Sequence, residues 1–462
     1  MAGNVNGAAW RQHLDQRQQE YLTQLSELVA IPSVSALARR RVDVASAAEW
    51  VAARLQQASV EHVRIHQLGA DSSVVYGDWL HAADAPTVVV YGHYDVQPAL
   101  VEDGWSSPPF APRVTDNRLY GRGTSDDKGN MLAPILATEA ILATEGELPI
   151  NVKFFFEGQE EVGSPDLSAF VAAHRDLLAA DFVLAADGSQ WSETEPELTL
   201  SFRGLCALEL TVQGPERDLH SGIYGGTVRN PIHALCSLLA GLHDPDGRVA
   251  VARFYDDVME PTPDQRQEFA RVPFDEAQHL AATAAPSLFG EKGWSTHERT
   301  WVRPTLEVNG VWGGFQGEGT KTVLPAVAHA KITCRLVANQ RPAEIFKHIE
   351  AHINQHVDPG VAVSVHAEEA AGAPYSVPAS HPGIQAAAAV LHESYGRAPY
   401  RVGSGGTLPL CGIFLEHLGI YTVPFSFGLD DEGAHGPDEF FRLDNFRRAQ
   451  LAYGDVLYAI AS

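Results

Sequence analysis

Apolar and polar residues alternate along the chain with two different periods. Residues 10–29 and 45–55 carry apolar side chains at helical spacing, so both segments are predicted to be helices. Short apolar runs typical of buried parallel strands then alternate with helical segments; the runs cover 87–91, 152–156 and 182–186, and the helices 128–143 and 167–178. This order predicts an α/β domain with a mostly parallel central sheet and helices on both faces.

The pattern changes near Arg203 and changes back after Pro378. Leu208, Leu210 and Val212 alternate with polar residues, as in a half-exposed strand. Further predicted elements of this middle segment are strands at 305–308, 329–337 and 361–365 and helices at 231–242 and 343–356. The α/β character returns with a helix at 384–395, a strand at 420–423 and a helix at 445–461. We therefore expect a discontinuous first domain, residues 1–203 and 379–462, with an α+β domain of residues 204–378 inserted in it.

Composition indicates an ordinary globular protein of two domains. The 462 residues exceed the usual size of a single core, and no apolar run is long enough to cross a bilayer. The net charge of −25 disfavours nucleic acid and anionic membranes as partners. The four cysteines form no CxxC pair, and residues 1–10 lack the basic and apolar segments of a secretory signal. We therefore expect a cytoplasmic protein.

Two adjacent carboxylates, Glu160 and Glu161, follow the apolar run 152–156. Like charges at the tip of a strand raise the cost of ionising each other, and a multivalent cation removes that cost. His93 and Asp187 also follow predicted strands. Because ligands gather at the carboxyl ends of parallel strands, we expect these four side chains to meet.

Two further motifs contain candidate ligands. His93 and Asp95 would lie on the same side of an extended segment, so His93 can bind a metal while Asp95 supports its other ring nitrogen; a surface salt bridge is the alternative. Asp126 lies in a glycine-rich loop that opens a helix, and its two oxygens could bridge two cations. Asp127 is better placed to cap the helix, and the alternative is that both are caps.

The two glutamates are expected to have different roles. One can bind a metal while the other acts as general base towards a water whose pKa metal coordination lowers to about 7. His435, in Gly433-Ala434-His435, completes a set of nitrogen and oxygen ligands that favours Zn²⁺ and permits Mn²⁺ or Co²⁺. A serine nucleophile motif is absent and no cysteine has a nucleophile setting, so the sequence predicts a carboxylate-rich, two-metal hydrolase.

In combination, these motifs resemble the di-zinc peptidase family of carnosine and other cytosolic dipeptidases, aminoacylase, succinyl-diaminopimelate desuccinylase and acetylornithine deacetylase. The resemblance covers nearly the whole chain and is carried by residues 92–98, 121–129, 160–164 and 433–435. It implies that His93 and Asp187 bind one metal, Glu161 and His435 bind the other, and Asp126 bridges both. It also implies that Glu160 is the general base and later the proton donor, and that Asp95 orients His93.

The same resemblance makes the inserted domain a lid and dimerisation domain. His220, in Asp218-Leu219-His220-Ser221-Gly222, would reach the active site of the partner in a homodimer and stabilise the oxyanion. Arg335 would bind the carboxylate of the substrate, for which a guanidinium is suited because it can bind bidentately. Thr322 and Thr407 would support the substrate.

The sequence departs from the family pattern before the Gly405-Gly406 turn. Carnosine-cleaving dipeptidases carry Arg-Glu there, and this chain has Gly403-Ser404, so substrate selection is expected to differ. The form of residues 94–98 resembles the dipeptidase branch. The expected reaction is metal-dependent hydrolysis of dipeptides or short peptides with a free C-terminal carboxylate. The alternatives are an N-acyl-amino-acid amidohydrolase and a non-catalytic binding relative.

Overall fold

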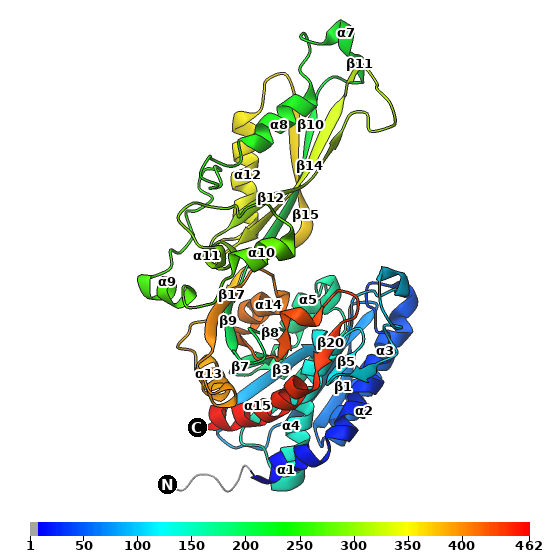
Figure 1. Ribbon diagram of the computed structural model, residues 1–462, viewed down its shortest axis with the longest axis vertical. Coiled ribbons are helices and arrows are strands. Elements are labelled where there is room, and N and C mark those ends of the chain that lie inside the picture. Colours follow the sequence, from blue (N-terminus) through cyan, green and yellow to red (C-terminus); the bar gives the residue numbers. More distant parts are fainter. Residues whose placement is uncertain (1–7) are drawn as a thin grey trace. The chain divides into compact units, whose positions relative to one another are not determined.

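The computed structural model describes residues 8–462, except the side chains of residues 8, 369 and 370. Residues 1–7, which contributed to the expectation about a secretory signal, lie outside this part. The chain forms two compact units. The first comprises Met1–Leu200, Val377–Arg401 and Pro409–Ser462, and the second comprises Ser201–Ser376 and Val402–Leu408 (Figure 1).

A six-stranded sheet forms the centre of the first unit, in the order β1-β2-β6-β3-β7-β18. Its strands are β1 (Glu61–Leu68), β2 (Ser72–Trp79), β3 (Thr87–His93), β6 (Asn151–Glu157), β7 (Phe182–Ala185) and β18 (Tyr421–Pro424). The last four pair in parallel, whereas β2 is antiparallel to β6 and to β1. The predicted mostly parallel sheet is confirmed. The sequence analysis missed β1 and β2, and β1 is an edge strand whose mostly exposed side chains give no buried run.

Helices cover both faces of this sheet. One group packs together around α4, and consists of α1 (Ala8–Gln16), α2 (Gln18–Val29), α3 (Arg41–Gln57), α4 (Gly129–Glu145), α13 (Pro382–Tyr395) and α15 (Leu443–Ala461). The other group is α5 (Leu167–Ala173), α6 (Arg175–Leu178) and α14 (Pro409–Leu418). Phe155 of β6 contacts Phe170 of α5 and Phe414 of α14. The predicted helices are confirmed, with breaks after Gln16 and Ala173.

Parallel pairing brings three strand ends to one edge of the sheet. The centre of β3 is fully buried between β6 and β7, as the apolar run 87–91 predicts. The segments that follow these strands therefore begin side by side. They carry His93 and Asp95 after β3, Glu160 and Glu161 after β6, and Asp187 after β7.

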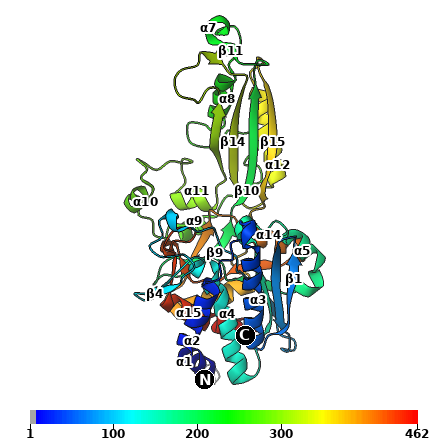
Figure 2. The ribbon, with the colours of Figure 1, turned by 90° about the vertical axis from the view of Figure 1, so that its right-hand side faces the viewer.

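The second unit is built on a four-stranded antiparallel sheet in the order β12-β14-β10-β15. Its strands are β10 (Gly204–Gln213), β12 (Thr305–Gly313), β14 (Val327–Leu336) and β15 (Ala362–Gly372). Helices α8 (Pro231–Ala240) and α12 (Pro342–His356) pack on one face (Figure 2). Leu208, Leu210 and Val212 are buried under these helices, which confirms the predicted alternation of β10.

Short elements complete the chain. A two-stranded sheet joins β11 (Leu219–His220) to β13 (Val323–Leu324) beside α7 (Ser221–Tyr224), and the remaining helices of the second unit are α9 (Pro263–Phe269), α10 (Glu276–Thr283) and α11 (Thr296–Trp301). The other small sheets are β16 (Tyr375–Ser376) with β9 (Glu197–Phe202) and β17 (Tyr400–Ser404), β20 (Phe440–Arg442) with β5 (Arg118–Tyr120) and β4 (Arg113–Thr115), and β19 (Gly428–Leu429) with β8 (Ser189–Gln190).

The unit boundaries differ from the expected ones at residues 201–203 and 402–408, which belong to the second unit, and at residues 377–378, which belong to the first. Thr407 donates its hydroxyl to the carbonyl of Arg203 at 2.6 Å, and a Cβ on Gly403 would lie 2.7 Å from the Cβ of Trp301. These tertiary contacts draw the segment into the second unit although its neighbours in sequence belong to the first.

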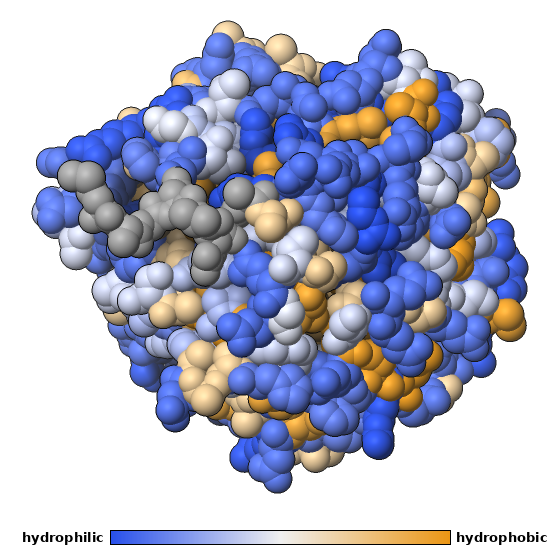
Figure 3. Space-filling model, turned by 90° about the horizontal axis from the view of Figure 1, so that it is seen from below, coloured by the Kyte–Doolittle hydropathy of each residue, from blue (hydrophilic) through white to orange (hydrophobic). Residues whose placement is uncertain are grey.

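Figure 3 looks onto the first unit from the side of α1, and polar side chains cover most of this face. None of the described helices has the length and hydropathy needed to cross a membrane.

Candidate metal centre

Seven of the predicted site residues lie together at the carboxyl edge of the first unit's sheet; they are His93, Asp95, Asp126, Glu160, Glu161, Asp187 and His435. They include two groups of potential metal ligands, His93 with Asp126 and Asp187, and Asp126 with Glu161 and His435. Within each group the ligand atoms lie within 4.8 Å of one another.

Asp126 is common to both groups. Its Oδ1 lies 3.1 Å from Nε2 of His93, and its Oδ2 lies 2.9 Å from Nε2 of His435. The residue sits in the loop that precedes α4, where Gly123 has a φ of 83° and a Cβ would lie 2.4 Å from Val96. Only glycine fits this position without strain. The two oxygens of Asp126 therefore face different histidines, as a ligand shared by two ions would.

Asp95 lies beneath the cluster and is fully buried. Its Oδ1 is 3.4 Å from Nδ1 of His93, which also lies 3.1 Å from the backbone carbonyl of Asp95. The carboxylate accepts hydrogen bonds from the backbone N–H groups of Glu160 and Glu161, at 3.2 and 3.1 Å. Asp95 thus contacts both the histidine and the turn that carries the two glutamates.

Asp127 differs from expectation. It caps no helix; instead its Oδ2 accepts a hydrogen bond from the backbone N–H of His93 at 3.1 Å, and the side chain is fully buried. The tertiary approach of β3 offers this donor, which local sequence cannot reveal.

Glu160 and Glu161 begin a short 3₁₀ turn (Glu160–Val162) and have different surroundings. The carboxylate of Glu161 accepts hydrogen bonds from the backbone and side chain of Gln97, at 3.1 and 2.8 Å, and lies 3.2 Å from Nε2 of His435. Glu160 accepts no side-chain hydrogen bond from any described residue. Burial, together with the charges of Asp187, Asp95 and Glu161, raises the pKa of Glu160 well above its usual value.

The cluster concentrates negative charge. Burial raises the pKa of Asp187 to about 6. Hydrogen bonds to Asp126 and then Glu161 raise the pKa of His435 to about 10. Among residues 8–462, no lysine or arginine forms an ion pair with Asp126, Glu160, Glu161 or Asp187. Carboxylates that converge on imidazole nitrogens, with no described lysine or arginine among them, match the ligand chemistry of divalent metals, so the donor set fits two such ions.

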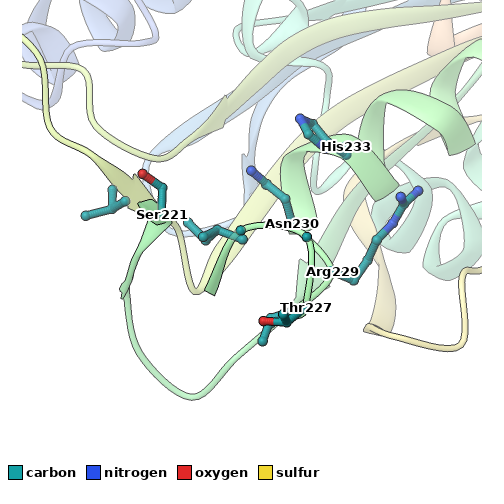
Figure 4. Close-up of a pocket in the computed structure, with 10 residues that line it drawn as sticks. Ser221, Thr227, Arg229, Asn230 and His233 are labelled. Atoms are coloured by element: carbon teal, nitrogen blue, oxygen red, sulfur yellow. The ribbon is translucent and has the colours of Figure 1, made fainter. Parts of the chain in front are cut away.

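The residues predicted in the inserted domain fall into two places of the second unit. His220 pairs with Val323 across β11 and β13, and the backbone of Thr322 accepts a hydrogen bond from Ser221 at 3.0 Å. His220 is exposed. A cavity of about 550 Å³ lies beside this hairpin, and Ser221, Thr227, Arg229, Asn230 and His233 contribute to its lining (Figure 4).

Arg335 lies at the other end of the sheet, where its Nη1 donates to Oγ1 of Thr407 at 3.0 Å. Arg203, which the sequence analysis missed, lies beside it and donates its Nε to the carbonyl of Gly405 at 3.2 Å. Burial, aided by the charge of Arg335, lowers the pKa of Arg203 to about 10. Neither arginine forms an ion pair with a described residue. Two cationic side chains and a hydroxyl therefore surround the Gly405–Thr407 turn.

His220 and Arg335 do not meet in one copy of the chain. Strand β10 ends at Gln213, and the chain then continues to His220 in β11. Arg335 pairs with Leu205, which lies near the opposite end of β10. At about 3.3 Å per residue, a ten-residue strand separates its ends by roughly 30 Å.

Comparison with known proteins agrees with this geometry. The family model described as peptidase family M20/M25/M40 matches residues 89–459. A curated relative, the Cys-Gly metallodipeptidase dug1 of Schizosaccharomyces pombe, is 30% identical and covers 97% of each chain. An M20 family metallo-carboxypeptidase from Sulfolobus solfataricus superposes with a TM-score of 0.83 at 29% identity, covering 96% of this chain and 99% of the other. Human carnosine dipeptidase 1 superposes with a TM-score of 0.80 at 27% identity, and the match covers 99% of each chain.

Proposed function

Because the chain belongs to peptidase family M20/M25/M40, we propose that it hydrolyses dipeptides or short peptides with a free C-terminal carboxylate, in a metal-dependent reaction. The observation that carries this proposal is the pair of ligand groups that share Asp126, with Glu160 beside them. The relative described as a Cys-Gly metallodipeptidase supports the substrate class.

We assign one ion to His93, Asp126 and Asp187, and the other to Asp126, Glu161 and His435. Zn²⁺ suits this mixture of imidazole and carboxylate ligands, and Mn²⁺ or Co²⁺ are the alternatives. When bound, such ions supply Lewis acidity and lower the pKa of water by several units. The residues around them position the substrate and move protons.

Glu160 is the proposed general base. Its carboxylate accepts no hydrogen bond from a described side chain, and its raised pKa suits a group that alternately takes and gives a proton. In this mechanism Glu160 takes a proton from the attacking water and returns it to the nitrogen of the leaving amine. Asp95 holds the backbone of this turn and orients His93.

The carboxylate of the substrate is assigned to the turn in the second unit. Arg335 provides a planar pair of donors, Thr407 provides a hydroxyl, and Arg203 adds a second positive charge. No carboxylate of a described residue pairs with either arginine, which supports this role because an anion from outside would complete the site.

We propose that His220 serves the active site of a second copy in a homodimer, where it stabilises the oxyanion and Thr322 supports the substrate. A dipeptide spans less than about 10 Å. His220 and Arg335 of one copy are roughly 30 Å apart along the sheet. Both can therefore act on one substrate only if they come from different copies. A cytoplasmic location is also proposed.

The test is hydrolysis of a dipeptide panel by chelator-stripped protein, with Zn²⁺ or Mn²⁺ added back, alongside N-acetyl and N-succinyl amino acids. Metal-dependent cleavage of dipeptides with a free amino group supports the proposal. Cleavage of the acylated compounds alone moves the protein to the amidohydrolase class with the same site chemistry. No cleavage of any substrate, with or without metal, refutes the assignment as a hydrolase.

A further inference from the structure

Glu439, a buried glutamate four residues after His435, organises the loop that carries Asp126. It is fully buried, and its Oε2 accepts hydrogen bonds from Nη1 of Arg122 at 2.7 Å and from the backbone of Gly123 at 2.8 Å. Its Oε1 accepts from the backbone N–H groups of Ser125 and Asp126, at 2.9 and 3.2 Å. All four donors belong to residues 122–126, so one carboxylate determines where the backbone of Asp126 lies.

A second buried glutamate, Glu432, lies three residues before His435 and binds the same loop. Its Oε2 accepts hydrogen bonds from Oγ of Ser125 at 2.6 Å and from the backbone of Leu429 at 3.0 Å. Its Oε1 accepts from the backbone and from Nη1 of Arg442, both at 3.1 Å. Leu429 and Arg442 lie on either side of the His435 segment, so Glu432 closes that segment and ties it to Ser125.

Two hydrogen bonds to backbone carbonyls strengthen the connection. Arg122 donates Nη2 to the carbonyl of Gly436 at 3.1 Å, and the N–H of Gly121 donates to the carbonyl of Glu439 at 2.9 Å. The loops that carry Asp126 and His435 thus form one hydrogen-bonded unit. His93 and Asp187 depend on other supports, because they lie at or just after the central strands β3 and β7.

We infer that Glu439 and Glu432 are positioning residues that hold Asp126 and His435 in the geometry needed to bind an ion; this inference rests on the proposed two-metal function. Metal–ligand distances tolerate deviations of about 0.2 Å, so ligands on loops need such support. Loss of outer partners of this kind lowers metal affinity about 10- to 100-fold. The ion held by Asp126, Glu161 and His435 should depend on these glutamates more than the ion held with His93 and Asp187.

The main variant is Glu439→Gln. Glutamine keeps the shape and one oxygen, but its NH₂ group faces N–H donors, so two of the four hydrogen bonds are lost. Calorimetric titration of chelator-stripped protein with Zn²⁺, and the visible absorption of the Co²⁺ form, measure binding without any assay of activity. Because Asp126 belongs to both ligand groups, we expect the affinity for the first equivalent to fall less than the affinity for the second, which should fall about 10- to 100-fold.

Two further variants make the test decisive. Ser125→Ala removes only the hydroxyl bonded to Glu432 and should weaken the second equivalent to a smaller extent. Glu139→Gln is the matched control, because Glu139 is also a buried glutamate of the first unit, but it pairs with Arg17 and Arg54 and contacts neither loop. The Glu139→Gln variant should unfold at a lower urea concentration and should bind both equivalents of Zn²⁺ with the affinity of the wild type.

The outcomes separate this inference from the proposed function. Wild-type titration curves for Glu439→Gln and Ser125→Ala overturn the inference and leave the function standing. Equal weakening of both equivalents in Glu439→Gln and Glu139→Gln also overturns it, because a general loss of stability would then explain the effect. Failure of the wild-type protein to take up two ions refutes both. If Glu439→Gln does not fold, Ser125→Ala decides.

Discussion

Replacing Arg335 by methionine removes the guanidinium that we propose binds the substrate carboxylate. Methionine retains much of the length and apolar character of the side chain, and the pairing of Arg335 with Leu205 and Thr305 is made by the backbone. Arg335 forms no ion pair with a described residue, so its loss leaves no described carboxylate uncompensated. The substitution should therefore affect substrate binding rather than folding.

The size of the effect follows from the contacts. A hydrogen bond with a charged group contributes about 1.5–3 kcal/mol. Arg335 already uses Nη1 on Thr407, and Arg203 remains nearby to attract the carboxylate. We therefore expect a loss of about 2–4 kcal/mol, which is roughly 30- to 900-fold in kcat/KM. Most of it should appear in KM, because the carboxylate is bound in the ground state and in the transition state alike.

The assay compares Ala-Ala with its C-terminal amide in both proteins. The wild-type enzyme should prefer the free carboxylate by the factor above, and the Arg335→Met enzyme should hydrolyse both poorly and at similar rates. Lys331→Met is the control, because Lys331 lies on the same face of β14 and also carries a positive charge, but is paired with Glu368 at 3.1 Å. A variant Arg335→Met that keeps the full preference for the carboxylate refutes the reasoning.

Glu160→Gln should reduce kcat about 10²- to 10⁴-fold because the general base is lost, while metal analysis still finds two ions; near-normal turnover would exclude the role of Glu160. The His220→Ala and Arg335→Met proteins should each be weakly active and should regain activity when mixed, because a hybrid dimer contains one active site with both His220 and Arg335. Absence of rescue argues against the proposal that His220 serves the active site of the other copy. Burial and then the charge of Asp430 raise the pKa of Glu197 to about 8. The folded state therefore binds this proton more tightly than the unfolded state, and the contribution of Glu197 to stability falls as pH rises from about 4.5 to 8. Urea unfolding at pH 6 and pH 9 should show that Glu197→Gln raises the free energy of unfolding relative to wild type more at pH 9 than at pH 6, and an equal effect at both values would contradict this.

The sequence predicted the parts of the fold whose signal is local. The buried runs of β3, β6 and β7 and the periodic faces of the helices are recorded in consecutive residues, so their positions were predicted within a few residues. His93, Asp187 and the Glu160–Glu161 pair were singled out because each follows such a run. The exposed edge strand β1 carried no such signal, and the sequence analysis did not predict it.

Other features depend on approaches between distant segments. Asp127 was interpreted as a helix cap, yet its carboxylate accepts from the backbone of His93, which only the packing of β3 places there. Arg203 is one of 33 basic residues, and nothing in its neighbourhood in sequence marks it; its place beside Arg335 follows from the pairing of β10 with β14. Residues 402–408 joined the second unit for the same kind of reason.

By itself, then, the sequence determined the family, the α/β class of the first unit and the residue types available for a metal centre, because hydrophobic period and short motifs are properties of neighbouring residues. Tertiary structure alone decided that the two oxygens of Asp126 face two histidines, and that Glu439 and Glu432 hold the loop of Asp126 from beneath. Hydrogen bonds between residues some 300 positions apart form only when the sheet and its loops have folded. For that reason these supports cannot be read from the local pattern.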